Sequence, residues 1–378
     1  MTMPNMIGAY GDFAASLLPT QPGPLSLQRC PRAEFPTRRA AAKARILERM
    51  APPTLGPIAA PEVRRRWEHD GLAVEELSWQ LPYGPRTEAW VLKPAGASGR
   101  LPAVLALHDH GAFKYWGKEK IAQAGPSVHP LIAEHRVHYE GAAWANEMAR
   151  RGFVVLIHDA YAFGSRRVRL ADLPPEIRGG LVEGDDSPAG IAAYNTWTKE
   201  HEHVMAKSLF SAGTTWPGMF WNEDRIALDF LCARPDVDPA RVGVGGLSGG
   251  GLRTVFLAGL DDRVACAVCV GMMTTWRDYL LHKSWTHTWM CYVPLLPQDL
   301  DYPEILGARA PRPTLVQNTR EDPLFTVPEM ERAVGQLADV FAASGAPDHF
   351  RASWYPGTHQ FNRAMQTEAF AWFERWLK

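Results

Sequence analysis

A serine, an aspartate and a histidine stand far apart in this chain, each in a setting suited to nucleophilic chemistry. Ser248 lies in the run Gly246-Leu247-Ser248-Gly249-Gly250, which has the pattern G-x-S-x-G. A serine hydroxyl is a poor nucleophile at neutral pH. It becomes a good one when a histidine removes its proton and a carboxylate orients that histidine. A chain that uses Ser248 in this way must therefore supply both partners.

The residues around Ser248 predict a strand, a tight turn and a helix. Val242 and Val244 belong to a short apolar run that ends at glycines, and apolar residues return at helical spacing over residues 252–260. A serine at the apex of such a turn is called a nucleophile elbow. Glycines suit it because the backbone there is strained and side chains would collide. The start of the helix would also direct backbone N–H groups toward a developing negative oxygen.

The two partners are predicted in loops that follow sheet strands. Asp322 follows the predicted strand 313–317, where a carboxylate can be held and partly desolvated; Glu321 is the alternative, and we favour Asp322. His359 follows the predicted last strand, residues 350–355. The chain order serine, acid, histidine is the one found when the nucleophile sits on an elbow of this kind.

Acyl transfer also needs two hydrogen-bond donors directed at the developing oxyanion. One is the N–H of Gly249, the residue after the serine. The other should come from the loop after the apolar run at residues 101–108, and we choose the N–H of His110. Gly111 and Ala112 are close alternatives. The spacing His-x-His at 108–110 also fits a zinc ligand pair, but we expect no metal and no cofactor.

Buried strands alternate with helices along most of the chain, which predicts an α/β fold with a mostly parallel sheet covered on both faces. Ligands of such sheets bind beyond the carboxyl ends of the strands. Residues 61–93 instead predict antiparallel strands. Besides the strand before Ser248 and the helix after it, the predicted strands are residues 101–108, 152–158, 263–270, 313–317 and 350–355, and the predicted helices are residues 37–50, 144–151, 222–234, 330–344 and 366–378.

The chain divides into an N-terminal arm with a helix, residues 1–60, and a main domain, residues 61–378. Two stretches of the main domain, 159–221 and 272–300, break the alternation, and we expect them to cover the site. Four tryptophans in these stretches are candidate pocket residues: Trp216, Trp221, Trp285 and Trp289. Their rings could stack on a sugar or an aromatic acyl group, or they could fill an irregular roof or a subunit interface.

Composition excludes several classes of protein. Of 378 residues, 46% are hydrophobic and 21% charged, and the net charge is −1, so neither nucleic acid nor a membrane surface is an expected partner. Five cysteines are an odd number, which disfavours a disulfide framework. The first 19 residues lack the charged start and apolar stretch of a leader peptide, and no apolar segment is long enough to span a membrane. We therefore expect a cytoplasmic protein, with homo-oligomerisation through the arm as one expectation.

Several motifs together resemble the serine α/β-hydrolases, and within them the dienelactone-hydrolase and acetyl-xylan-esterase-like group. The resemblance covers residues 63–378. The matching segments are His108-Asp109-His110-Gly111, Gly117-Lys118-Glu119-Lys120, Arg151-Gly152-Phe153, residues 238–250, residues 318–325 and residues 355–359.

The resemblance implies the α/β-hydrolase fold and a triad of Ser248, His359 and Asp322 that hydrolyses a small-molecule ester through an acyl-enzyme. Dienelactone hydrolases use a cysteine nucleophile; the serine here favours ordinary carboxylic esters. Two alternatives stay open: a serine peptidase or amidase on the same fold, and a catalytically silent binding protein.

Overall fold

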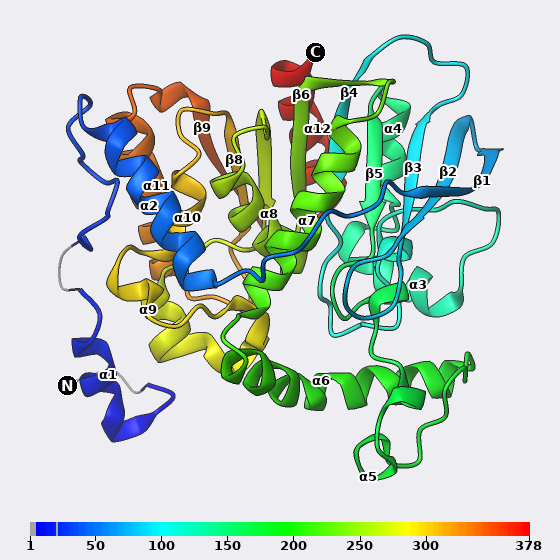
Figure 1. Cartoon of the computed structure of the whole chain (residues 1–378). Coiled ribbons are helices and arrows are strands. Elements are labelled where there is room, and N and C mark those ends of the chain that lie inside the picture. The colour runs from blue at the N-terminus through cyan, green and yellow to red at the C-terminus, as the bar shows by residue number, and fades with distance from the viewer. Residues whose placement is uncertain (1–4, 20–21) are drawn as a thin grey trace.

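A single nine-stranded sheet runs through the computed structural model, which describes residues 5–19 and 22–378 (Figure 1). The strand order is β1-β2-β3-β5-β4-β6-β7-β8-β9. The strands are β1 (Glu62–His69), β2 (Leu72–Trp79), β3 (Thr87–Pro94), β4 (Leu101–Ala106), β5 (Val154–His158), β6 (Val237–Leu247), β7 (Cys266–Val270), β8 (Thr314–Thr319) and β9 (Phe350–Tyr355).

The sheet changes from antiparallel to parallel at β5. β1, β2, β3 and β5 pair antiparallel, as predicted for residues 61–93, and all pairs from β5 to β9 are parallel. The carboxyl ends of the parallel strands therefore meet at one edge, and the loops after β4, β6, β8 and β9 leave the sheet there. The predicted fold class is confirmed.

Helices cover both faces of the sheet (Figure 1). On one face lie α2 (Phe35–Met50), α7 (Trp216–Cys232), α8 (Gly249–Leu260), α10 (Tyr302–Gly307) and α11 (Val327–Ala343). On the other lie α4 (Trp144–Arg150) and α12 (Arg363–Leu377). The remaining helices are α1 (Gly11–Ser16), α3 (Pro130–His135), α5 (Pro175–Arg178), α6 (Pro188–Ser211) and α9 (Trp276–Asp278).

The two faces explain why the central strands are apolar throughout. Along β4, Ala103 and Leu105 belong to one buried cluster, while Val104 and Ala106 belong to the cluster on the opposite face. Successive side chains of a strand point to opposite sides, so a strand covered on both faces must be apolar at every position.

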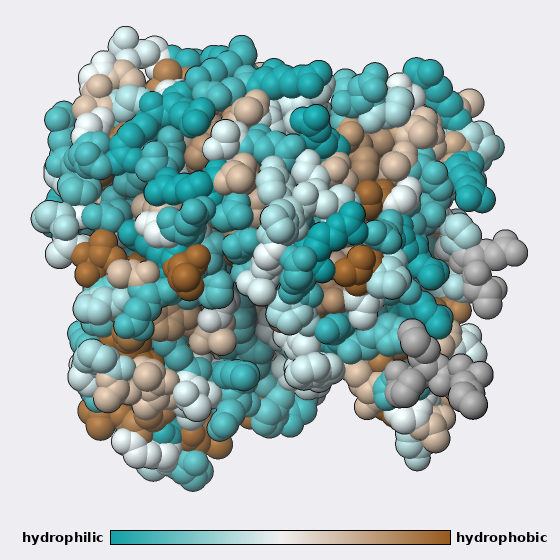
Figure 2. Space-filling model, turned by 180° about the vertical axis from the view of Figure 1, so that it is seen from behind, coloured by the Kyte–Doolittle hydropathy of each residue, from teal (hydrophilic) through white to brown (hydrophobic). Residues whose placement is uncertain are grey.

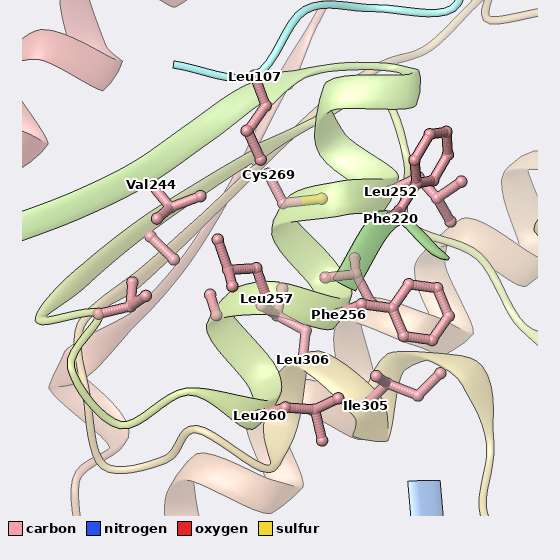
Figure 3. Packing of buried hydrophobic residues seen from close by; sticks show 14 of the residues in the cluster. Leu107, Phe220, Val244, Leu252, Phe256, Leu257, Leu260, Cys269, Ile305 and Leu306 are labelled. Atoms are coloured by element: carbon pink, nitrogen blue, oxygen red, sulfur yellow. The ribbon is translucent and has the colours of Figure 1, made fainter. Parts of the chain in front are cut away.

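The helix that follows Ser248 packs its apolar side chains into the core on one face of the sheet (Figure 3). Leu257 is fully buried in it, near Leu306 of α10, and Leu252 lies near Phe220 of α7. Arg253, also on α8, forms a buried ion pair with Asp224 of α7. Every residue of α8 from Gly250 to Leu260 is buried, so the surrounding core determines the position of the elbow.

Two parts of the fold differ from the sequence-based prediction. Helix α7 begins at Trp216, six residues before the predicted start at 222, because the Thr215 hydroxyl accepts the Gly218 N–H and Pro217 suits the first turn. The stretch 159–221 also contains α6, a helix of 24 residues that the sequence did not predict. In Figure 1, α6 lies along the lower end of the sheet.

The N-terminal arm lies against its own domain. The Glu304 carboxylate of α10 accepts hydrogen bonds from the Ser26 hydroxyl and the Leu27 N–H, at 2.6 and 2.7 Å. Apolar side chains are exposed on the arm, as at Phe13, and beside α5, as at Val182. Figure 2 shows hydrophobic residues at the two lower corners, where α1 and α5 lie. No helix in the described part of the chain has both the length and the apolar character needed to cross a lipid bilayer.

The packing of α8 generates a stability prediction. Leu257→Ala should lower the free energy of unfolding by about 2–5 kcal/mol, because it leaves a cavity in a closely packed core. Urea denaturation measures the change. Leu17→Ala is the matched control, because that side chain is 55% exposed, and it should have little effect. Equal effects of the two substitutions would contradict the packing described for α8.

Candidate active site

Ser248 sits at the turn between β6 and α8 in a strained backbone conformation, with φ 57° and ψ −117°. A positive φ is uncommon for a residue with a side chain, and such strain persists only where neighbouring structure enforces it. The Ser248 N–H donates to the Val270 carbonyl of β7 at 2.9 Å. Its hydroxyl does not cap the helix, and the residue is only half-buried. The hydroxyl is therefore available for another partner.

The glycines around Ser248 are required by the close approach of the chain after β4. A Cβ on Gly246 or Gly250 would overlap the Leu107 carbonyl oxygen, and a Cβ on Gly249 would lie 2.6 Å from the His110 nitrogen. Any side chain at these positions would push the two loops apart. The glycines of the G-x-S-x-G pattern are therefore needed for the contact between the two backbones as well as for the sharp turn.

His359 and Asp322 lie side by side. His359 Nδ1 is 2.6 Å from Asp322 Oδ2, and Asp322 is 5% exposed. The other oxygen of Asp322 accepts the Leu324 N–H at 3.0 Å. Glu321, the alternative acid, is exposed and accepts the Gly357 N–H instead.

This hydrogen bond determines which nitrogen of His359 carries the proton. An ionised carboxylate can only accept, so Nδ1 is the donor and Nε2 of the neutral ring keeps its lone pair. Nε2 is buried and has no hydrogen-bond partner among residues 5–19 and 22–378. The lone pair of Nε2 is therefore not used by any described residue.

The imidazole of His359 lies close to Gly271, which directly follows β7, the strand paired with β6. A Cβ on Gly271 would be 3.0 Å from His359 Cε1 and 3.2 Å from the Leu247 side chain, so the ring and the residue before Ser248 border the same small space. His138 holds the histidine loop in place: its carbonyl accepts the Phe361 N–H at 2.7 Å. The structure thus brings together the loops that carry Ser248, Asp322 and His359.

Two backbone N–H groups adjoin the serine. Those of Gly249 and His110 lie next to each other and have no acceptor within the described residues. The Ala112 N–H is occupied, because it donates to His110 Nδ1 at 3.0 Å. A Cβ on Gly111 would overlap the side chains of Asp109 and His135, so Gly111 is packed away from the elbow. Of the three predicted candidates, His110 is the one placed beside Gly249.

The His110 side chain is bound by Glu202 of α6. His110 Nε2 lies 2.6 Å from Glu202 Oε1, which also accepts from the Lys114 ammonium. Burial would raise the pKa of Glu202, but the charges and hydrogen bonds of His110 and Lys114 outweigh it and lower the pKa. An ionised Glu202 therefore ties the loop after β4 to α6.

The rings of His108 and His110 do not converge as metal ligands would. His108 Nε2 accepts the Ala160 N–H at 3.2 Å, whereas His110 is bound to Glu202. Within the described ranges, no group of three or more histidine, cysteine or acidic side chains has a metal-binding arrangement.

The four candidate tryptophans differ in exposure. The expectation for Trp216 was wrong. Its side chain is fully buried in the hydrophobic core at the start of α7, so this structure does not offer its ring to a substrate. Trp221 is partly buried against the same core. Trp285 and Trp289 are 75% and 40% exposed. Of the four, these last two have the most ring surface free for a ligand.

The sequence analysis did not identify Glu202, Lys120 or Asp109 as residues that hold the loop after β4. All three are charged and buried. Their positions in the sequence could have indicated such a role. Lys120 lies in a Gly-Lys-Glu-Lys run and Glu202 lies between two histidines, in stretches otherwise rich in aromatic residues. Charged groups inside apolar surroundings must be paired, which marks them as structural or functional.

Comparisons with known proteins were made by sequence and by structure. No protein-family profile matches the sequence. The chain is similar to YtaP of Bacillus subtilis (strain 168), described provisionally as a hydrolase, with 27% identity over 319 residues, 84% of this chain and 92% of YtaP.

Solved structures share the fold at low sequence identity. One is an enzyme of Bacteroides fragilis described provisionally as an acetyl xylan esterase: TM-score 0.68, 18% identity, 93% of this chain and 83% of that chain. Another is a glucuronoyl esterase of Solibacter usitatus: TM-score 0.63, 15% identity, 96% of this chain and 99% of that chain. This chain has the α/β-hydrolase fold that the sequence motifs predicted.

A half-buried histidine beside the loop of Asp322 generates a pH prediction. His287 Nε2 donates to the Leu324 carbonyl at 2.8 Å, in the loop that carries Asp322. Burial lowers the pKa of His287 to about 4, against the opposing effect of this hydrogen bond. An unfolded histidine titrates near 6.5. Between these pH values the unfolded chain holds a proton that the folded chain lacks, so stability falls as the pH falls from about 6.5 to about 4.

His287→Gln keeps a donor for Leu324 and removes this proton. The slope of unfolding free energy against pH should then be smaller than in the wild type by up to about 1.4 kcal/mol per pH unit over that range. Chemical denaturation at a series of pH values measures it, with the exposed His203→Gln as control. An unchanged slope in His287→Gln would show that His287 is not held neutral by the fold.

Proposed function

We propose that this protein is a serine hydrolase that cleaves a carboxylic ester of a small molecule through an acyl-enzyme intermediate. One observation carries the proposal: the Asp322 carboxylate occupies Nδ1 of His359, so that Nε2 is a buried free acceptor beside the serine elbow. A general base for a serine needs this combination of tautomer and position.

The proposed first step forms the acyl-enzyme. His359 Nε2 takes the proton of the Ser248 hydroxyl as Oγ bonds to the ester carbonyl carbon, and the carbonyl electron pair moves onto its oxygen. The N–H groups of Gly249 and His110 donate to that oxyanion, assisted by the N-terminus of α8. When the carbonyl re-forms, the bond to the leaving alcohol breaks and the alcohol takes the proton from His359.

Water completes the cycle by the same route. It loses a proton to His359 Nε2 and attacks the acyl carbon, and the second tetrahedral intermediate releases the acid and returns the proton to Ser248. Asp322 remains ionised throughout and stabilises the imidazolium that forms twice. No step requires a metal or a cofactor.

The activities by which the structural neighbours are named support a carbohydrate ester as the substrate class. An acetyl xylan esterase and a glucuronoyl esterase act on carboxylic esters of sugars, either at a sugar hydroxyl or at a sugar carboxyl group. The exposed rings of Trp285 and Trp289 are available to stack on a sugar face. An aryl ester would use the same rings, and a substrate panel distinguishes the two.

Ser248→Ala should abolish ester turnover while the protein still folds. The expected loss of kcat on p-nitrophenyl acetate is on the order of 10⁴-fold or more, because the variant has no nucleophile. A fluorophosphonate should label Ser248 in the wild type, as read by mass spectrometry of the peptide. Matched ester and anilide substrates separate an esterase from an amidase. Unchanged turnover in Ser248→Ala, or no labelling of an active wild type, would refute the proposal.

The neighbouring acids offer a matched pair of substitutions. Asp322→Asn should lower kcat by about 10³–10⁴-fold, because an amide favours the wrong tautomer of His359. Glu321→Gln keeps an acceptor for Gly357 and should stay close to the wild-type rate. Initial rates on one ester, with circular dichroism as the folding check, measure both. The reverse order of effects would assign the acid to Glu321.

A further inference from the structure

Lys120 is a fully buried lysine directly behind the loop that follows β4. Its ammonium donates to the carbonyl oxygens of Asp109 and His110, at 2.7 and 3.0 Å. It also lies 3.7 Å from the Asp109 carboxylate and 4.8 Å from the centre of the Phe163 ring. Burying an ammonium costs several kcal/mol unless its protons are well used. Here the ammonium donates two hydrogen bonds to main-chain carbonyls.

The Asp109 carbonyl and the His110 N–H belong to one peptide unit. A trans peptide is planar, so its C=O and N–H point in opposite directions. Lys120 binds the carbonyl end of this unit, and the N–H end lies beside Gly249. His108 adds a second donor to the same carbonyl: its Nε2 accepts from Ala160, so Nδ1 carries the hydrogen and donates to Asp109 O at 3.0 Å.

We infer that Lys120 is a positioning residue for the oxyanion site: its ammonium holds and polarises the Asp109–His110 peptide so that the His110 N–H points at the reacting carbonyl. This inference rests on the proposed function. A cation on a peptide oxygen draws electron density from the nitrogen, and cooperative polarisation of this kind makes the N–H a stronger donor. The effect is largest when the acyl oxygen carries a full negative charge, that is, in the transition state.

The Asp109 side chain is engaged elsewhere, so it does not replace Lys120. Its carboxylate accepts from His135 Nε2 at 2.9 Å and from the Tyr139 hydroxyl at 2.5 Å. These bonds attach the loop to α3 and the turn after it. They fix the position of Asp109, whereas Lys120 fixes the orientation of the following peptide.

The charge of Lys120 is present at neutral pH and is lost in the mildly alkaline range. Burial lowers the pKa of Lys120 to about 8. The charged groups around it are the carboxylates of Asp109, Asp159 and Glu119, which favour the ammonium, and the Lys114 ammonium, which opposes it. Deprotonation leaves a neutral amine that still donates to the carbonyls but polarises them less.

The experiment compares Lys120→Met with Lys118→Met. Lys118 is also buried, but its ammonium binds Asp159 Oδ2 and Glu119 Oε1 at 2.9 Å and does not contact the Asp109–His110 peptide. Lys120→Met should lower kcat on p-nitrophenyl acetate about tenfold to hundredfold, with KM changed less than about twofold. Affinity for a trifluoromethyl ketone, which forms an anionic adduct with the serine, should fall by the same factor as kcat/KM. Lys118→Met should change neither, and Lys120→Arg should recover most of the loss.

A wild-type measurement covers the case in which Lys120→Met does not fold. Affinity of the wild type for the trifluoromethyl ketone should weaken as the pH rises through about 8, while circular dichroism shows an intact fold. Constant affinity between pH 7 and 9.5, a folded Lys120→Met with wild-type kcat, or an equal loss in Lys118→Met would overturn the role of Lys120. Failure of the proposed function is distinct, because the wild type would then neither hydrolyse the ester nor be labelled by a fluorophosphonate.

Discussion

The contact between two stretches of backbone controls this site: the chain after β4 lies against the glycines of the serine elbow. Gly246, Gly249 and Gly250 have no room for a Cβ because Leu107 and His110 occupy that space. Ser248 is strained at this contact, and the His110 nitrogen approaches Gly249 there. Core packing around α8 and buried charges behind the β4 loop hold the two stretches together from opposite sides. Strain at the serine is therefore balanced by stability elsewhere in the fold.

Parallel pairing of the central strands brings the other two side chains to the same place. Asp322 follows β8 and His359 follows β9, which are neighbours in the sheet, so their loops emerge together although 37 residues separate them. The pairing of β6 with β7 then sets Ser248 beside Gly271, against which the imidazole rests. Strand order alone thus assembles residues that are distant in the sequence.

Sequence patterns could predict the fold class, most strands and the contact between Asp322 and His359. These depend on local signals: apolar runs, glycines at a turn, and polar residues just after strands. They could not predict α6 or the early start of α7. Helix α6 has little amphipathic character, and its role becomes visible only through Glu202, which binds a histidine 92 residues away. Trp216 was predicted to lie in a covering loop because Thr215 and Pro217 start its helix before the apolar pattern becomes regular. The buried charged pairs behind the β4 loop join residues far apart in the sequence, so they produce no periodic pattern that a sequence analysis could detect.

A crystal structure of the protein after reaction with an alkyl fluorophosphonate tests the central claim most directly, because the phosphonate on the serine mimics the tetrahedral intermediate. The account predicts phosphorus bonded to Ser248 Oγ, with the phosphoryl oxygen about 2.7–3.1 Å from both the Gly249 and the His110 nitrogens. His359 Nε2 should lie within hydrogen-bond distance of Oγ. A phosphoryl oxygen directed away from His110, or an adduct on another residue, would contradict it.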